Sequence, residues 1–251
     1  MQAERLTQLR EAIAAIEHGK PRRAPSSRCI GGLPVTPGFH EWFGLADSPR
    51  APRTQRWIPP LGILLYLARR SLKNPDHGGR GGAGVVWIGR RCWPFFQGLP
   101  PDDRGVLLQR SIFIDPPDDM SRLWAIDLAA RCPAVAAVVA DGSRLDMAAT
   151  RRLQLAAESG SALVLCARPP EEINHLSAAT TRWLVRCAPS ADKTPRTPRW
   201  NVELVRCKAM HPGSQWTVEW KSAQGGVVVH AVLADRPDPA IPARAPVRRS
   251  A

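Results

Sequence analysis

The stretch VAAVVAD at residues 135–141 decides the fold class, because it is an apolar run of strand length that ends in one carboxylate. A second apolar run, ALVLC at residues 162–166, follows after a segment of helical length. Neither run alternates with polar residues, which is typical of strands buried on both faces of a parallel sheet. The segment therefore predicts a strand–helix–strand crossover in an α/β fold, in which ligands bind beyond the strand ends at Asp141 and Arg168.

The helix between these two strands has a signature at each end. Ser143 and Asp146 stand at the spacing of a capping box, which predicts the first turn, and Gly160 predicts the end. Further helices are predicted at residues 61–72, 120–131 and 171–179. Further strands are predicted at residues 38–44, 85–88, 111–114, 181–186, 200–206, 216–220 and 227–233. Two of the last runs alternate, so we expect antiparallel strands to extend a mainly parallel sheet.

The composition supports a globular protein with a substantial core, since 44% of the 251 residues are hydrophobic. No apolar run reaches the length of a membrane span and the N-terminus lacks a signal-peptide pattern, so we expect a cytoplasmic protein without contact to a membrane. The six cysteines form no Cys-x-x-Cys pair, which argues against a zinc site. Three of them lie in apolar runs and are expected to be core thiols: Cys132, Cys166 and Cys207.

The N-terminal segment has the pattern of an amphipathic helix. Four apolar residues are spaced by 3, 4 and 3 positions: Leu6, Leu9, Ile13 and Ile16. Such a narrow stripe packs on its own domain or on another chain, and the Pro- and Arg-rich linker after it favours another chain. The predicted organisation is an amphipathic helix, a linker, a core domain and a disordered tail, at residues 1–18, 19–35, 36–234 and 235–251.

The formal net charge of +13 suits nucleic acid or an acidic protein partner, although a generic basic surface explains it equally well. Arg90, Arg91 and Trp93 follow the strand at residues 85–88 and form the candidate DNA-binding cluster. Guanidinium groups grip phosphate, and an indole stacks on a base. The alternative for these three residues is a solvated rim. The basic loop at residues 193–199 is a second candidate for contact with DNA.

Three acids lie together in DPPDD at residues 115–119. They indicate either a metal site or a proline turn whose carboxylates stand at a helix N-terminus. The second interpretation is favoured, because the helix dipole attracts negative charge there and no histidine or further acid clusters nearby. In the helix that follows, we expect Leu123, Trp124 and Leu128 to face the sheet.

An apolar strand that ends in an acid is typical of P-loop NTPases, in which the acid is associated with Mg²⁺. Their phosphate loop reads Gly-x-x-x-x-Gly-Lys-Ser/Thr after the first strand. The corresponding positions of this chain hold Pro49, Arg50 and Ala51 in place of Gly, Lys and Ser/Thr. Asp141 is therefore a magnesium-type acid without a phosphate loop, and the sequence predicts no nucleotide site.

Other catalytic signals are equally incomplete. The Gly-x-Gly-x-x-Gly pattern at residues 79–84 follows a predicted helix and precedes a strand, the reverse of a dinucleotide-binding turn. The histidines are scattered, and no nucleophile motif is present, so we predict no catalytic residues. A divergent ATPase that holds its nucleotide through Arg50, Arg53 or Arg56 is the alternative.

Several segments of the sequence together resemble the ImuA family, RecA-like proteins of bacterial damage-induced mutagenesis cassettes. The resembling segments are HEWFG (40–44), WIPPLG (57–62), VVWIGRRCWP (85–94), DPPDDxxRLWAID (115–127), CPAVAAVVADG (132–142), ATRRLQLA (149–156), LSAAxxRWLV (176–185) and WNVELVRCK (200–208). They span about residues 38–220, so the resemblance covers most of the chain.

This resemblance implies a RecA-like core, a degenerate P-loop NTPase fold, and a role in translesion synthesis and mutagenesis during the SOS response to DNA damage. The implied partners are an ImuB-type relative of the Y-family polymerases and an error-prone C-family DNA polymerase. RecA is a further implied contact, and DNA is a possible partner, bound directly or through these proteins.

The functional positions of RecA carry over at Asp141 alone. Gly89, Arg90 and Arg91 stand where the acid that activates water belongs. The resemblance therefore implies a non-catalytic adaptor that holds no cofactor and no metal. The alternatives are a divergent ATPase and a repair protein that binds DNA directly.

Overall fold

The computed structural model describes residues 33, 35–44, 57–72, 83–96, 99–189, 197–207, 214–221 and 226–233. The chain divides into one unit of residues 1–36 and a second unit of residues 37–251, and every element below belongs to the second. Several predicted features lie outside the described residues: the helix with Leu6, Leu9, Ile13 and Ile16, most of the linker, Arg50, Arg53 and Arg56, the glycine-rich run, most of the basic loop and the C-terminal tail.

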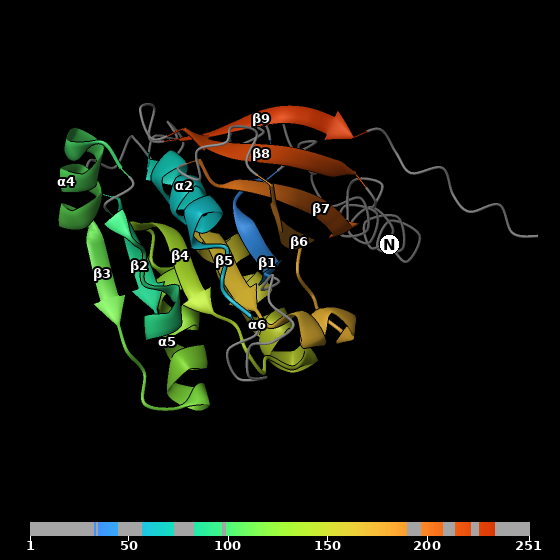
Figure 1. Ribbon diagram of the computed structural model, residues 1–251. Helices are drawn as coiled ribbons and strands as arrows, with labels where there is room; N and C mark the ends of the chain where they lie inside the picture. The colour runs from blue at the N-terminus through green and yellow to red at the C-terminus, as the bar shows by residue number, and fades with distance from the viewer. Residues whose placement is uncertain are drawn as a thin grey trace, which may run out of the picture. The chain divides into compact units, whose positions relative to one another are not determined.

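The described strands form one sheet in the order β3-β2-β4-β5-β1-β6-β7-β8-β9 (Figure 1). The first six in this order are parallel: β3 (Ser111–Ile114), β2 (Gly84–Ile88), β4 (Val135–Asp141), β5 (Leu163–Arg168), β1 (Gly38–Gly44) and β6 (Thr181–Ala188). Three antiparallel strands continue from β6: β7 (Arg199–Cys207), β8 (Gln215–Lys221) and β9 (Gly226–Leu233). The predicted α/β fold, with a mainly parallel sheet extended by antiparallel strands, is confirmed.

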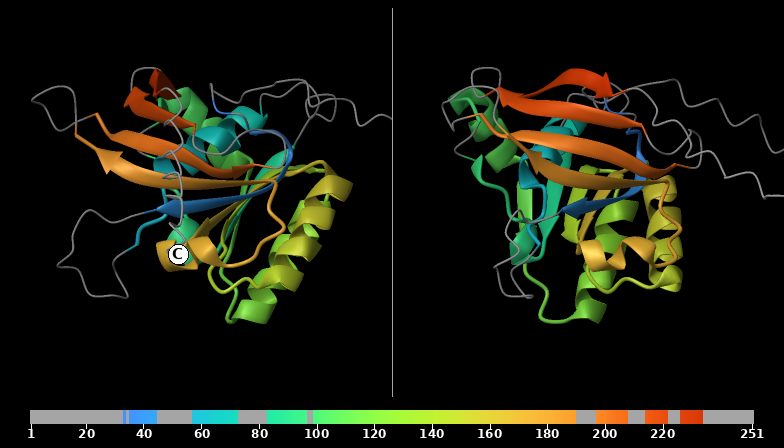
Figure 2. Two further views of the ribbon diagram at one scale, coloured as in Figure 1. Left: turned by 90° about the vertical axis from the view of Figure 1, so that its right-hand side faces the viewer. Right: turned by 45° about the vertical axis from the view of Figure 1, so that its right-hand side comes forward.

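Helices cover both faces of the parallel part of the sheet (Figures 1 and 2). α2 (Leu61–Leu72) lies on one face, and α5 (Asp119–Arg131) and α6 (Met147–Gly160) lie side by side on the other. α4 (Pro101–Gln109) precedes β3 and buries Leu107 alone. Two 3-10 turns follow β2 and β5: η2 (Arg90–Cys92) and η4 (Pro170–Asn174). None of the helices that the structure describes is long and apolar enough to cross a membrane.

The face under α5 and α6 holds a continuous hydrophobic core. The strands contribute every second residue to it: Phe39, Val86, Ile88, Val138, Ala140, Val164 and Cys166. The helices contribute small and branched side chains, among them Ile126, Ala130, Leu153, Ala156 and Ala157. Successive side chains of a strand point to opposite faces, so the unbroken apolar runs of β4 and β5 fill both faces of the sheet. Their burial on two faces is confirmed.

Aromatic side chains pack on the opposite face, where the sheet changes from parallel to antiparallel. Trp42 of β1 stacks on Trp183 of β6, with ring centroids 5.1 Å apart and planes inclined by 9°. Trp216 of β8 lies against Trp183 at 5.5 Å between centroids. Trp200 of β7 covers Gly62 of α2 so closely that an added Cβ would come within 2.9 Å of the indole ring. These rings join the parallel and antiparallel parts into one core.

The start of α6 differs from the prediction. Asp146, rather than Ser143, is the N-cap residue, and its carboxylate accepts a hydrogen bond from the backbone N–H of Ala149 at 2.7 Å. Ser143 donates to Asp141 instead. Both residues are good N-caps, so the spacing alone could not decide between them. The helix ends at Gly160 as predicted.

Two other helices also differ from the prediction. Residues 171–179 form only the short turn η4 and an irregular segment, because the side chains of Glu172 and Ser177 bond into the buried sheet. The helix α4 was not predicted, since its sequence PDDRGVLLQ contains a glycine and no amphipathic stripe.

The described cysteines span the full range of burial: Cys92 and Cys166 are buried, Cys132 and Cys207 are half-buried, and Cys187 is exposed. The prediction of a core thiol is confirmed for Cys166. Burial raises the pKa of both buried thiols, and the charge of Asp141 adds to this effect on Cys92, as that of Glu41 does on Cys166. Both groups therefore stay protonated at physiological pH.

We expect a thiol reagent at pH 8 to modify Cys187 while Cys92 and Cys166 stay unmodified in the folded protein, because the thiolate is the reactive form. Mass spectrometry of labelled peptides measures this, and labelling of Cys166 as fast as Cys187 would contradict it.

The unfolded chain ionises the thiols of Cys92 and Cys166 near their ordinary pKa of 9.0. Their burial therefore favours folding below that pH, and this contribution is lost as the pH rises further.

Candidate functional site

The carboxyl edge of the sheet brings together the ends of β2 and β4. Gly89 follows β2 with a φ of 84°, and the turn Arg90–Cys92 starts there. A Cβ added at Gly89 would lie 3.2 Å from the Cβ of Asp141, the last residue of β4. The two strand ends are therefore in contact, and Arg91 reaches Asp141 across them.

The carboxylate of Asp141 has a polar neighbour at each oxygen. Its Oδ1 accepts hydrogen bonds from the backbone N–H of Ser143 at 2.9 Å and from the Ser143 hydroxyl at 2.6 Å. Its Oδ2 lies 3.7 Å from Nε of Arg91. In this arrangement Asp141 acts as a structural acid that orders the loop before α6 and holds the turn after β2.

The candidate DNA-binding residues share one turn, but each has its own partner. Arg90 is 76% exposed and pairs with Asp115 at 2.5 Å. The Arg91 guanidinium lies over the ring of Trp57 at 4.9 Å from its centroid, in addition to its contact with Asp141. Trp93 is partly exposed and packs edge-on against Phe113. Arg90 is thus the residue of this cluster that is most accessible to a phosphate.

The three acids of residues 115–119 also have separate partners. Asp118 caps α5 and accepts a hydrogen bond from the backbone N–H of Ser121 at 2.7 Å, which holds the pKa of its carboxyl below the usual range. The interpretation as carboxylates at a helix N-terminus is confirmed by this cap. Within the described part of the chain, no group of three His, Cys, Asp or Glu side chains is arranged as a metal site requires.

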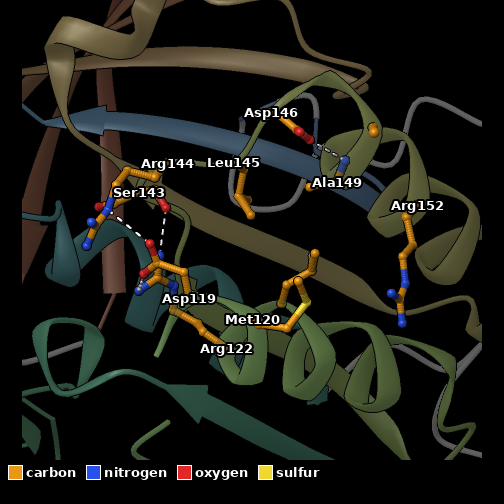
Figure 3. Close-up of a pocket in the computed structure, with 11 residues that line it drawn as sticks. Asp119, Met120, Arg122, Ser143, Arg144, Leu145, Asp146, Ala149 and Arg152 are labelled. Atoms are coloured by element: carbon orange, nitrogen blue, oxygen red, sulfur yellow. Dashed lines mark hydrogen bonds and ion pairs between the residues drawn. The ribbon is translucent and has the colours of Figure 1, made fainter. Parts of the chain in front are cut away.

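A hollow of about 380 Å³ lies between the N-terminal ends of α5 and α6 (Figure 3). Arg122 and Arg144 both pair with Asp119, at 3.0 and 3.2 Å, and Arg122 also donates to the carbonyl of Ser143 at 2.7 Å. Figure 3 shows this ionic cluster at one side of the hollow, with Met120 toward the other side. The cluster could not be read from the sequence, because Arg144 comes from the loop before α6 while Asp119 and Arg122 lie on α5.

A buried ionic network crosses β1, β5 and β6 next to this hollow. Glu41 has no exposed surface, and its two oxygens accept hydrogen bonds from Arg168 at 2.5 Å and from Arg182 at 2.7 Å. Ser177 donates to the same carboxylate at 2.9 Å. Glu41 and Arg182 stand opposite each other in the β1–β6 register, so the fold itself places them together.

Glu172 completes the network from the turn η4. It accepts two hydrogen bonds from Arg168 at 2.8 and 2.5 Å, and the backbone N–H of Arg144 donates to its other oxygen. Burial by itself would lower the pKa of Arg168, but Glu41 and Glu172 outweigh it and the pKa is raised. Two arginines and two glutamates balance in charge. The network therefore clamps η4 and the loop before α6 onto the sheet.

The sequence held a signal for this network. Glu41 and Arg182 are charged residues inside runs that read as buried strands, and a buried charge requires a partner. Arg168 was placed correctly at the end of its strand, but it serves as a partner of Glu41 rather than as an open ligand contact.

The outer face of α5 differs from the expectation. Trp124 and Leu128 were expected to face the sheet, but both are largely exposed, and the buried side is formed by smaller residues such as Ala125, Ile126 and Ala129. The helix is apolar around most of its circumference, so its pattern could not show which side is buried. As a result, α5 presents a tryptophan and a leucine to solvent.

A second exposed apolar surface lies at the β3 edge of the sheet. Its members come from β3, α4 and the segment after η2: Trp93, Phe95, Val106, Leu108, Ile112 and Phe113. Trp93 contacts Phe113 directly, which ties the segment after η2 to the edge strand. Ile112 and Phe113 are successive residues of β3 and point to opposite faces of the sheet, so the exposed side chains border this edge on both faces. Large apolar residues exposed at a sheet edge are candidates for protein–protein contact.

No family model matches the chain. The chain is 34% identical over 212 residues to "Protein ImuA" from two strains of Caulobacter vibrioides, NA1000 / CB15N and ATCC 19089 / CIP 103742 / CB 15. The match covers 78% of this chain and 80% of the Caulobacter protein. With identity of this level over most of both sequences, the chain belongs to the ImuA family.

Proposed function

We propose that the chain is a RecA-like adaptor that hydrolyses no ATP and supports error-prone translesion DNA synthesis in the SOS response. In this role it bridges an ImuB-type relative of the Y-family polymerases and an error-prone C-family polymerase, with RecA as a further contact. Membership of the ImuA family supports the setting in mutagenesis. The parallel sheet with β1 at its centre supports the RecA-like assignment.

The observation that carries the proposal is the state of Asp141. Here Oδ1 accepts two hydrogen bonds from Ser143, and the guanidinium of Arg91 lies 3.7 Å from Oδ2. A positive charge already stands beside this carboxylate, which disfavours a second cation there. Pro49, Arg50 and Ala51 stand where a phosphate loop has Gly, Lys and Ser/Thr. Both features favour a scaffold role over hydrolysis.

The exposed apolar side chains support a role in protein binding. The β3 edge and the outer face of α5 each present large apolar residues to solvent. Burial of such residues in an interface drives association through the hydrophobic effect. The N-terminal residues Leu6, Leu9, Ile13 and Ile16 are proposed as a further contact.

Tagged co-purification from damage-treated source cells tests the adaptor role. The full chain is compared with a variant that lacks residues 1–18. We expect the full chain to recover a Y-family polymerase relative and an error-prone polymerase, and the truncated chain to lose one of them. Recovery of nucleic acid alone would contradict the adaptor and favour direct DNA binding through Arg90, Arg91 and Trp93.

The absence of hydrolysis is tested on the purified chain. We expect no Mg²⁺-dependent ATP turnover above that of Asp141→Ala, because the carboxylate serves the loop at Ser143. A Mg²⁺-dependent turnover that disappears in Asp141→Ala would support the divergent ATPase instead. Calorimetric titration with Mg·ATP gives an independent reading of nucleotide binding.

A further inference from the structure

We propose that the outer surface of α5 and α6 docks an acidic, amphipathic helix of a partner protein. This α5–α6 surface consists of Met120, Trp124 and Leu128 from α5 and Arg151, Arg152 and Leu155 from α6. The inference rests on the proposed adaptor function and names one surface by which the chain would hold a partner.

The apolar part of the surface is a stripe along α5. Met120, Trp124 and Leu128 are 73%, 60% and 54% exposed, and their spacing of four residues places them on one side of the helix. The stripe is about 12 Å long, which matches two turns of a partner helix. The outward face of a helix that covers a sheet is normally polar, so three large apolar residues in line indicate a binding surface.

The neighbouring helix continues this surface. Leu155 of α6 is 45% exposed, and Arg152 joins the two helices by donating to Asp127 of α5 at 2.9 Å. The hollow between the N-terminal ends of the helices is lined by Met120 and Arg152 and by the small residues Ala148 and Ala149. It offers a recess for one anchoring side chain beside the stripe.

Charge selects an acidic partner. Arg131, Arg151 and Arg152 are all substantially exposed on this face. The acid between them, Asp127, is nearly buried and bonded to both Arg131 and Arg152. Burial would raise the pKa of Asp127, but these two arginines outweigh it and hold the pKa below its usual range. The carboxylate therefore stays ionised between its arginines. Glu158 is also exposed on the outer side of α6, so three arginines stand against two acids and the net charge of the surface is positive.

The chemistry favours a protein over DNA. Three of the four apolar residues, Met120, Leu128 and Leu155, have no aromatic ring to stack on a base. Two parallel helices with a recess between them match an amphipathic helix whose apolar residues recur at three- and four-residue spacing. Acidic residues beside those anchors would meet Arg151 and Arg152 at the rim, where charge improves specificity and association rate.

Site-specific photo-crosslinking in damage-treated source cells tests the proposal. A benzophenone amino acid replaces Trp124 in one full-length variant and Phe95, an exposed residue of the β3 edge, in another. We expect the Trp124 variant to capture a peptide with apolar residues at helical spacing and a net negative charge. Capture of nucleic acid, of a basic segment or of a second copy of this chain at Trp124 would overturn the proposal.

The two positions separate failure of the surface from failure of the adaptor. Capture of a polymerase component at Phe95 and of nothing at Trp124 overturns the docking surface and leaves the proposed function standing. Capture at neither position, together with no polymerase in the co-purification, overturns both.

The captured segment is then synthesised as a peptide and titrated against the full chain. We expect Trp124→Ala and Leu128→Ala each to weaken binding by at least about 10-fold, since buried aromatic and aliphatic anchors dominate interfaces. Arg151→Glu should also weaken binding of the peptide, and this loss should be larger at low salt than at high salt, because salt screens exposed charges. Phe95→Ala is the matched control and should change the affinity by less than about 2-fold. An affinity unchanged in Trp124→Ala would overturn the proposal.

Discussion

Replacement of Arg168 by methionine should lower the free energy of unfolding by about 3–5 kcal/mol, because it leaves Glu172 without a cation and Glu41 with Arg182 alone. Glu41 and Glu172 both bond to this guanidinium, and Arg168 has no exposed surface. Methionine fills part of the same volume, so the loss reports on charge rather than on a cavity. Urea unfolding followed by tryptophan fluorescence measures it.

A matched control exists on the same sheet. Arg186 pairs with Glu203 at 3.3 Å, but both side chains are accessible to water. Arg186→Met should therefore cost less than about 1 kcal/mol. Equal losses for the two variants would mean that the network at Glu41 contributes no more than a surface ion pair.

Replacement of Gly160 by alanine should destabilise the chain by about 3 kcal/mol, as expected for an overpacked site. A Cβ at this position would overlap the carbonyl oxygen of Ala130, at the end of the neighbouring helix α5. Backbone cannot move aside as a flexible side chain can, so the ends of α5 and α6 would have to separate. Thermal unfolding monitored by circular dichroism measures the effect.

Gly105 is the control for this substitution. It lies within α4, and a Cβ added there meets nothing within 4 Å. Gly105→Ala should therefore raise stability by about 0.5–1 kcal/mol, because alanine has the higher helix propensity. A stabilising effect at both positions would show that α5 and α6 approach each other less closely than the structure indicates.

The sequence allowed the strands to be predicted more accurately than the side-chain contacts between the elements. The apolar runs of β4 and β5 and the alternation in β7 and β8 identified the sheet, because burial leaves a direct pattern in strands. Helix α5 was placed correctly, and Leu123 packs against the core as predicted, but Trp124 and Leu128 were assigned wrongly to its buried side. Since most of its circumference is apolar, only packing against the sheet decides that Ala125 is inside and Trp124 outside.

The candidate site was harder to predict than the fold. The candidate residues Asp141, Arg90, Arg91 and Trp93 were identified from their positions at strand ends, and β2 and β4, which they end or follow, are neighbours in the sheet. Their partners Ser143, Asp115 and Trp57 could not be assigned, because each pairing depends on loop geometry. The pairing of Glu41 with Arg182 could not be predicted either, because the two residues are 141 positions apart in the sequence.

The central position of β1 has a consequence for synthesis of the chain on the ribosome. β1 is made first, yet it pairs with β5 and β6, which are made last among the parallel strands. His40 contacts Thr181, so translation must add 141 residues before this contact forms. At ordinary translation rates that interval lasts roughly 7–30 s. Throughout it, a strand that carries Phe39, Trp42 and Phe43 stays outside the ribosome with both edges unpaired, as a segment that can pair with other chains.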